Sequence, residues 1–443
     1  MKFFLSLFVL FFILTKAYYQ RIVSVISIFR HGARTPINHF EIVKDLFFPF
    51  HHGEVTPNGL RQHYLLGRFL RQRYIENKNP EMNILKKNFL KNDIKIYSQN
   101  MQRTVNSAVA HLSGLFKNDL IFSEYQEYLE HSLQFSNPNP PVIENDSIFS
   151  KSEYVKIINS KFLIINQKND KILSPRECFK LIREFDNTVF YLTDEEKAKI
   201  NSLHSLFPSQ IESIIQSNYN VRTMKKLLDL IVTTNYHFRN HFNIDKEVLK
   251  IFKKYWLKYS YQEKISDSNK KLLVSSFFEA IINNFDNFIY HCRPFKKFIK
   301  GKISVKEKFF KQSKDDCLKM MVFSGRDTSL VDIISNLIDE DYINSLIDNN
   351  TFEENNTSMS FLIPKFASSF LFELHYDEKT FKYYVKIMYN GQESLRNFKK
   401  ILGKNINYDS EKGIPYEDFK ALLTSRINIE YNGLNCSEFD YEK

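Results

Sequence analysis

Apolar runs that end in polar turns recur along the 443-residue chain, and a pattern of helical period follows each of them. The runs cover residues 23–29, 94–98 and 318–323, and the first is β-branched or aromatic except for two serines. Strands with so little polar relief are typical of parallel sheets buried on both faces. Because each run leads into a helix, we predict an α/β fold with a mostly parallel central sheet flanked by helices.

The helix after the first run has the clearest start. Thr56 suits an N-cap and Pro57 suits the first helical position. Small or apolar residues then recur every three or four positions, at Leu60, Tyr64, Gly67, Leu70 and Tyr74. This stripe predicts a helix that lays one face on the sheet, and the mid-helix Gly67 predicts close contact between the helix and the sheet.

Two later patterns complete the predicted core. Residues 370–374 and 383–388 each alternate in polarity, and polar residues 377–379 lie between them, which predicts a hairpin. Residues 413–419 are expected to begin the last helix.

The pattern changes after residues 137–141, where three prolines mark a loop. Beyond this loop the chain is mostly helical in period, with apolar stripes at Met224, Leu227, Leu228 and Ile231 and at Phe277, Phe278, Ile281, Ile282 and Phe285. We therefore predict an α/β core of residues 18–134 and 301–443, interrupted by a helical insert of residues 135–300.

Residues 1–17 have the pattern of a secretory signal peptide, with Lys2, a 12-residue apolar run and the small Ala17. The run is too short for an ordinary membrane span, although an uncleaved anchor is the alternative. Residues 439–443 match neither a lipid-anchor tail nor a retention signal. We expect a secreted protein, or one in the lumen of a lysosome or vacuole, without a stable membrane anchor.

The formal net charge is +11, and loss of residues 1–17 would lower it to +9 by removing two lysines and no acid. A basic chain raises the question of nucleic-acid binding. However, its lysines are scattered in pairs such as Lys253 and Lys254, without interleaved stacking aromatics. We predict no nucleic-acid partner and a basic surface that attracts small anionic substrates. The loop histidines His39, His51 and His52 lack the spacing of a metal site, so we predict no metal and no cofactor.

Side chains that could bind a ligand or take part in a reaction follow each of the three apolar runs. They are Arg30, His31, Arg34, Arg103, Arg326 and Asp327. Ligands of open α/β sheets bind beyond the carboxyl ends of the strands, where helix starts favour anions. Two arginines beside a histidine repel each other unless an anion lies between them, and forked guanidinium groups suit phosphate. His31 could then attack phosphorus. The alternative is a solvated basic turn, with Arg103 in a surface contact.

The sequence Arg30-His31-Gly32-x-Arg34-x-Pro36 resembles the signature of the histidine acid phosphatase family, branch 2 of the histidine phosphatases. Residues 53–67 and 413–419 are similar to that family too, whereas the insert is not. The resemblance implies hydrolysis of phosphomonoesters through a phosphohistidine. His31 would be the nucleophile, Arg30, Arg34 and Arg103 would bind the phosphoryl group, and Asp327 would donate the proton. A phytase-like inositol polyphosphate phosphatase remains an alternative.

Arg326 departs from the family pattern, in which a histidine normally precedes the catalytic aspartate. Arginine also donates hydrogen bonds, but its side chain is longer and always charged. It could pair with Asp327 or a nearby acid, or it could add a fourth cationic contact to the phosphate. Both outcomes predict reduced turnover, so a phosphate-binding member without turnover is a further alternative.

The four cysteines suit an exported protein, and four cysteines allow three pairings. The resemblance implies a Cys178–Cys436 disulfide, which leaves Cys292 with Cys317; free thiols are the alternative. Export would also expose glycosylation sequons at Asn145, Asn349, Asn355, Asn356 and Asn435. The sequence leaves open whether the protein forms a homodimer.

Overall fold

The computed structural model describes residues 20–47, 50–87, 92–116, 165–167, 170–178, 191–238, 241–262, 266–292, 298–299, 302–303, 317–348, 362–393 and 406–430. The predicted signal peptide, the five sequons and the side chains of Cys178 and Cys436 lie outside this described part.

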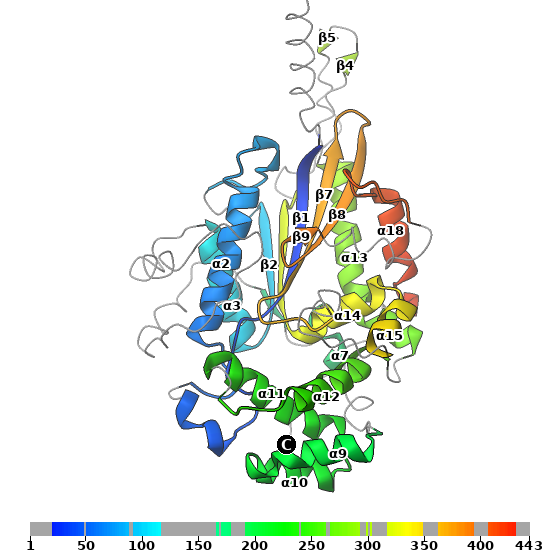
Figure 1. Cartoon of the computed structure of the whole chain (residues 1–443). Helices are drawn as coiled ribbons and strands as arrows, with labels where there is room; N and C mark the ends of the chain where they lie inside the picture. Colours follow the sequence, from blue (N-terminus) through cyan, green and yellow to red (C-terminus); the bar gives the residue numbers. More distant parts are fainter. Residues whose placement is uncertain are drawn as a thin grey trace, which may run out of the picture.

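A mixed eight-stranded sheet forms the centre of the molecule, in the order β10-β8-β7-β1-β6-β2-β3 with β9 beside β8 (Figure 1). Its parallel half consists of β1 (Gln20–Arg30), β6 (Met320–Gly325), β2 (Ile94–Gln99) and β3 (Ile165–Gln167). Its antiparallel half consists of β7 (Ser369–Asp377), β8 (Lys382–Tyr389), β9 (Gln392–Glu393) and β10 (Ile414–Pro415). The α/β class and the β7–β8 hairpin are confirmed, and the hairpin pairs directly with β1. The short strands β4 (Phe298–Ile299) and β5 (Lys302–Ile303) form a separate sheet.

Helices cover both faces of the sheet, which explains why successive residues in the middle of β1 are apolar on both faces. Val25 and Phe29 face the cluster formed with α2 (Pro57–Tyr74) and α3 (Gln102–Phe116). Ile26 and Ile28 face the opposite cluster, formed with α13 (Asp267–His291), α14 (Asp327–Leu337) and α18 (Tyr416–Ser425). Figure 1 shows these two groups of helices on either side of the strands.

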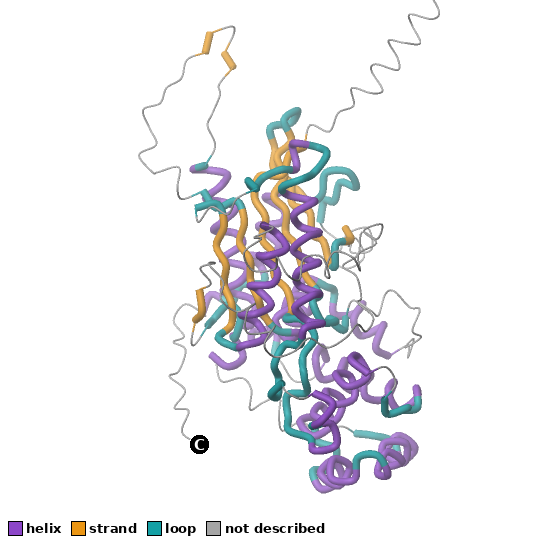
Figure 2. The backbone as a smooth tube through the Cα atoms, turned by 90° about the vertical axis from the view of Figure 1, so that its left-hand side faces the viewer, coloured by secondary structure: helices purple, strands orange, loops and turns teal. Residues whose placement is uncertain are grey.

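A separate group of helices lies beyond the carboxyl end of β1 (Figures 1 and 2). This helical set consists of α9 (Asp194–Asn201), α10 (Pro208–Gln216), α11 (Val221–Phe238) and α12 (Lys246–Leu257), followed by the π-helix η5 (Lys258–Gln262). It has its own core, and the loop after β1 contributes Phe40, Val43 and Phe47 to that core. The loop is therefore held on both sides, by the sheet and by the helical set.

The remaining short elements connect these layers. They are η1 (Glu41–Val43), η2 (Asp45–Phe47), η3 (Pro80–Met82), α7 (Pro175–Cys178), η4 (Ser202–Ser205) and α15 (Glu340–Asp348).

Two segments from the predicted insert, residues 135–300, pack with the sheet. β3 pairs with β2 at the sheet edge, and α13 lies along the sheet, where the Phe277 ring is 5.3 Å from that of Phe323. An apolar stripe predicts that a helix is packed but does not say against which surface. The division into core and insert stays a prediction, with α13 and β3 on the core side.

The predicted contact between Gly67 and the sheet was wrong, because Gly67 packs against another helix. A Cβ atom at Gly67 would lie 2.0 Å from the carbonyl oxygen of His111 on α3. Reciprocally, a Cβ atom at Gly114 would lie 2.0 Å from the carbonyl oxygen of Tyr64 on α2. The two glycines thus allow the backbones of α2 and α3 to touch, and these helices position the residues that follow β1 and β2.

The disulfide between Cys292 and Cys317 is confirmed, with 5.5 Å between the Cα atoms. It joins the end of α13 to the residues that precede β6. Within the described residues, no helix combines the length and the apolarity that a membrane crossing requires.

We predict that Gly114→Ala destabilises the protein by about 1–3 kcal/mol, because the added methyl group overpacks the contact between α2 and α3. Helix propensity alone predicts the opposite sign, a gain of roughly 0.5–1 kcal/mol. Urea unfolding monitored by circular dichroism would measure the difference. Ser209→Ala, at an exposed position of α10, is the control and should not lower the midpoint. A Gly114→Ala midpoint at or above that of the parent would contradict the tight contact.

Candidate active site

The carboxyl ends of three neighbouring parallel strands form the site. β6 lies between β1 and β2, and Arg30 of β1 is in register with Gly325 of β6. The His31 amide donates to the Gly325 carbonyl at 3.0 Å, and Ser324 donates to the Thr104 carbonyl at 2.7 Å. The segments after all three strands are thereby fastened together. All six residues predicted from the sequence reach this edge, where their charges act on one another.

His31 directly follows β1 and is buried, with 2% of its surface exposed. Its Nδ1 atom is 2.8 Å from the carbonyl oxygen of Gly32. A carbonyl only accepts, so Nδ1 carries the proton of the neutral ring and Nε2 holds a lone pair. Burial lowers the pKa of His31 well below its usual value, and the charges of Arg103, Arg30 and Arg34 lower it further. The ring is therefore neutral even at acidic pH, and its Nε2 lone pair is available.

Asp327 occupies the first position of α14, where its carboxylate is 3.3 Å from the guanidinium of Arg30. Burial alone would raise the pKa of Asp327, but the charges of Arg30, Lys225 and Arg34 outweigh it and hold the pKa well below its usual range. Asp327 is thus ionised.

Arg30 is held by contacts that leave part of its guanidinium for a ligand. It donates to the carbonyl of Pro364 at 2.6 Å and stacks 4.3 Å from the ring centroid of Phe366. Burial lowers the pKa of Arg30, while the charge of Asp327 raises it. The Phe366 ring also lies 6.0 Å from that of His31, so one aromatic side chain borders both residues.

Arg34 is paired with an acid from the helical set. Its Nη1 and Nη2 atoms donate to the two carboxylate oxygens of Asp229 on α11, at 3.2 and 2.7 Å. Nη1 also donates to the Thr35 carbonyl at 2.9 Å. The contact therefore links the loop after β1 to α11.

Arg103 and Arg326 complete the cationic side of the site. Arg103 lies in the first turn of α3, and its pKa is lowered to about 9 by burial and by the charges of Arg34 and Arg326. Arg326 is the N-cap of α14, and its amide is 3.4 Å from the Ser329 hydroxyl. Two carboxylates of α14 are paired with other arginines: Asp327 forms an ion pair with Arg30, and the buried Asp332 forms one with Arg176.

Sequence reasoning missed Asp229, Lys225 and Phe366. Asp229 and Lys225 are spaced one helical turn apart on α11, between apolar positions that belong to the stripe of an ordinary amphipathic helix. Phe366 lies in a loop before β7 and is only one of 42 phenylalanines. No spacing or motif distinguishes these residues, so only their position in the fold identifies them.

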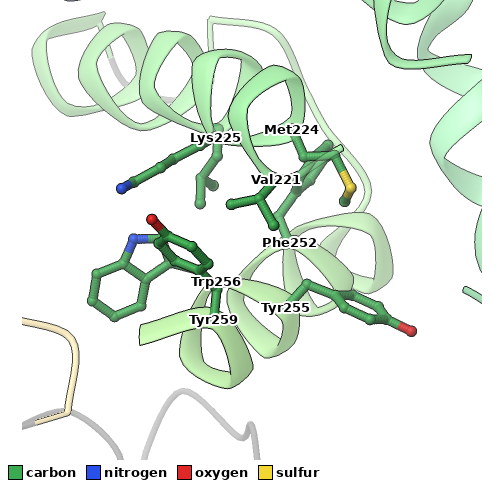
Figure 3. Close-up of a pocket in the computed structure, with 8 residues that line it drawn as sticks. Val221, Met224, Lys225, Phe252, Tyr255, Trp256 and Tyr259 are labelled. Atoms are coloured by element: carbon green, nitrogen blue, oxygen red, sulfur yellow. The ribbon is translucent and has the colours of Figure 1, made fainter. Parts of the chain in front are cut away.

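An apolar groove between α11 and α12 adjoins the site through Lys225 (Figure 3). Its walls include Leu228, Trp256 and Tyr259. The Lys225 ammonium lies 4.8 Å from the ring centroid of Tyr259, and its charge also acts on Asp327. One lysine of the groove is thus within electrostatic reach of Asp327.

The loop histidines contact each other and an acid, with His39 and His52 rings 4.6 Å apart and His39 at 3.3 Å from Glu41. Among the residues that the structure describes, no three His, Cys, Asp or Glu side chains are grouped to hold a metal ion.

Comparison with known proteins places this arrangement in a family. The chain is 34% identical to prostatic acid phosphatase from Bos taurus over 94 residues, 21% of this chain and 22% of that protein. It is 33% identical to lysosomal acid phosphatase from Homo sapiens over 96 residues, 21% of this chain and 21% of that protein. The matched stretch therefore spans about a fifth of these curated relatives.

Solved structures resemble the whole fold. A Hafnia alvei phytase in complex with tartrate has a TM-score of 0.51 at 13% identity, over 93% of this chain and 98% of that chain. The Klebsiella sp. ASR1 phytase has a TM-score of 0.50 at 11% identity, over 93% and 97%. A family model covers residues 21–390, which include every residue of the site. The chain therefore belongs to the histidine phosphatase superfamily (branch 2).

Proposed function

We propose that this protein is an acid phosphatase that hydrolyses phosphomonoesters through a phosphohistidine on His31. One observation carries the proposal: a buried, neutral imidazole with an unprotonated Nε2 lies among arginines and beside an ionisable carboxyl group. Such a site offers a nucleophile, an anion cradle and a group for proton transfer within one cluster.

The proposed reaction has two steps. Nε2 of His31 attacks phosphorus while the bond to the leaving oxygen breaks, and protonated Asp327 donates its proton to that oxygen. Water then attacks the phosphohistidine, Asp327 accepts a proton from the water, and the P–N bond breaks to release phosphate. Arg30, Arg34, Arg103 and Arg326 would hold the phosphoryl oxygens as charge develops on them.

The charge balance supports binding of an anion. Asp327 offsets the charge of Arg30 and Asp229 offsets that of Arg34, whereas the pKa of Arg103 is lowered to about 9 by burial and by neighbouring arginines, which an anion would relieve. A bound phosphoryl group would share the charge of Arg30 and thereby raise the pKa of Asp327, since the pairing that depresses it is weakened. Substrate would in this way help Asp327 to take up the proton that it later donates.

We further propose that the chain is exported, to the outside of the cell or to a lysosomal or vacuolar lumen, after cleavage of residues 1–17. The Cys292–Cys317 disulfide supports an oxidising compartment. The matched relatives include proteins named lysosomal and prostatic acid phosphatase.

A phytase-like activity is the second candidate, because the solved structures of similar fold are phytases. The apolar groove between α11 and α12 favours the first candidate. Trp256, Tyr259 and Leu228 would meet a leaving group there, and Lys225 is the one charged residue that lines the described groove. Burying the remaining phosphates of an inositol polyphosphate against such walls is unfavourable.

His31→Ala should lower phosphatase activity at least about a thousandfold, because no other group can form the covalent intermediate. Arg34→Ala and Arg103→Ala should lower it by about a hundredfold. The measurement is acid-labile ³²P trapped on the protein from a labelled phosphomonoester at about pH 4 to 6. His31 should keep its reactivity as the pH falls through 6.5, since its own pKa lies well below that value. Label that persists on His31→Ala would rule out this nucleophile.

An aryl phosphate should be hydrolysed with at least about tenfold higher kcat/KM than inositol hexakisphosphate, since an aromatic leaving group can pack in the groove. Initial rates of phosphate release at one acidic pH provide the comparison. Trp256→Ala should lower the ratio of kcat/KM for the aryl phosphate to kcat/KM for the inositol ester. Tyr290→Ala, at an exposed position of α13, should leave this ratio unchanged. Faster release from the inositol ester would favour the phytase-like function.

Arg326→His should raise turnover at acidic pH by about tenfold, because histidine donates a hydrogen bond without the permanent charge that retains phosphate. Single-turnover kinetics would separate faster phosphate release from faster chemistry. The parent would then behave mainly as a phosphate binder with slow release. If the variant is no faster and the parent is already fully active, the site has adapted to arginine and the impaired alternative fails.

A further inference from the structure

Asp229 connects the helical set to the phosphate-binding loop. It lies on α11, its side chain is 18% exposed, and it accepts two hydrogen bonds from Arg34. It also accepts the backbone N–H of Ile37 at 2.9 Å. One carboxylate therefore orients both a buried arginine and the loop that carries it.

The pairing uses only one end of the Arg34 guanidinium. Nη1 donates its two hydrogens to Asp229 and to the Thr35 carbonyl, and Nη2 donates one hydrogen to Asp229. The second hydrogen of Nη2 and the Nε–H lie on the adjacent edge of the planar group. Nε is buried and has no hydrogen-bond partner within the described part of the chain. This edge presents two parallel donors, the geometry that binds phosphate bidentately.

α11 reaches the same loop at two further points. His237 Nε2 is 2.8 Å from the Thr56 hydroxyl, which in turn donates to the Ala33 carbonyl at 3.1 Å. Gln62 accepts the Ala33 amide at 2.9 Å and donates to the Tyr236 hydroxyl at 2.7 Å. The helix thus supports the backbone beside Arg34 as well as its side chain.

We propose that Asp229 is a positioning residue, which fixes the Arg34 fork end-on so that its Nε edge faces the transferred phosphoryl group. For turnover, the inference rests on the proposed phosphatase function. For phosphate binding it stands without that function, since it concerns only the orientation and charge of Arg34.

Loss of the Asp229 carboxylate should strengthen phosphate binding and lower kcat. Without Asp229, Arg34 is a buried charge that lacks its counterion until an anion binds, so phosphate gains affinity. At the same time the fork loses its fixed orientation, and misplacement of a group that stabilises the transition state slows the chemistry. A purely structural role would weaken both properties or reduce the fraction of folded protein.

The test compares the parent with Asp229→Asn and Asp229→Glu in the full-length protein at one pH. Calorimetry with inorganic phosphate measures the Kd, and aryl phosphate hydrolysis measures kcat, normalised to the trapped phosphohistidine. For Asp229→Asn we expect phosphate to bind about threefold to tenfold more tightly and kcat to fall about thirtyfold. Asp229→Glu keeps the charge and should restore both values towards those of the parent.

Asp286→Asn is the matched control. Asp286 is 25% exposed and pairs with Lys420 at 2.7 Å, a similar ion pair between α13 and α18. This variant should change neither value by more than about twofold. Unchanged or weaker phosphate binding by Asp229→Asn overturns the positioning role. If the parent binds phosphate but has no turnover, the proposed function fails and the binding comparison still decides the role of Asp229.

Discussion

Repulsion among buried arginines is the constraint on which this structure depends. Arg30, Arg34 and Arg103 lie within electrostatic reach of one another and of His31 at one edge of the sheet. Burying like charges is costly unless each is paired or hydrogen-bonded. Asp327 offsets Arg30 from the start of α14, and Asp229 offsets Arg34 from α11. The cluster is therefore tolerable only when the sheet, α14 and the helical set are assembled together.

The same charges set the protonation states that the chemistry needs. Burial lowers the pKa of His31 and the field of these charges lowers it further. For Asp327 burial acts in the opposite direction, and the field outweighs it and lowers the pKa. The imidazole stays neutral and keeps a lone pair, as a nucleophile requires, whereas the carboxyl group is ionised and acts as a counterion. In the proposed function, a phosphoryl anion would weaken this field, and the effect would reach Asp327 directly through its pairing with Arg30. The substrate would in this way be part of the electrostatic balance.

The sequence could predict whatever depends on local pattern. The three strand–turn–helix units follow from apolar runs that are buried on both faces, and the convergence of Arg30, Arg103 and Asp327 follows from parallel topology. Choice of packing partner could not be predicted, because a helical stripe is the same whether it faces a sheet or a helix; α13 and Gly67 both illustrate this. Asp229 could not be predicted either, since one carboxylate on an amphipathic helix carries no pattern. Its contact with Arg34 forms only when α11 packs against the loop after β1.

Arg326 adds a further positive charge at the start of α14. It occupies the N-cap in extended backbone, with φ −112° and ψ 176°, and so adds a positive side chain at the positive end of the helix dipole. Such a placement is unfavourable in itself, and Arg103 nearby adds to the repulsion. Acids on α14 offset part of it, since Asp327 lies in the first turn and the buried Asp332 feels the charge of Arg326. Asp327 pairs with Arg30 and Asp332 pairs with Arg176. The amides at the start of α14 and the charge of Arg326 together favour an oxyanion bound at this helix start.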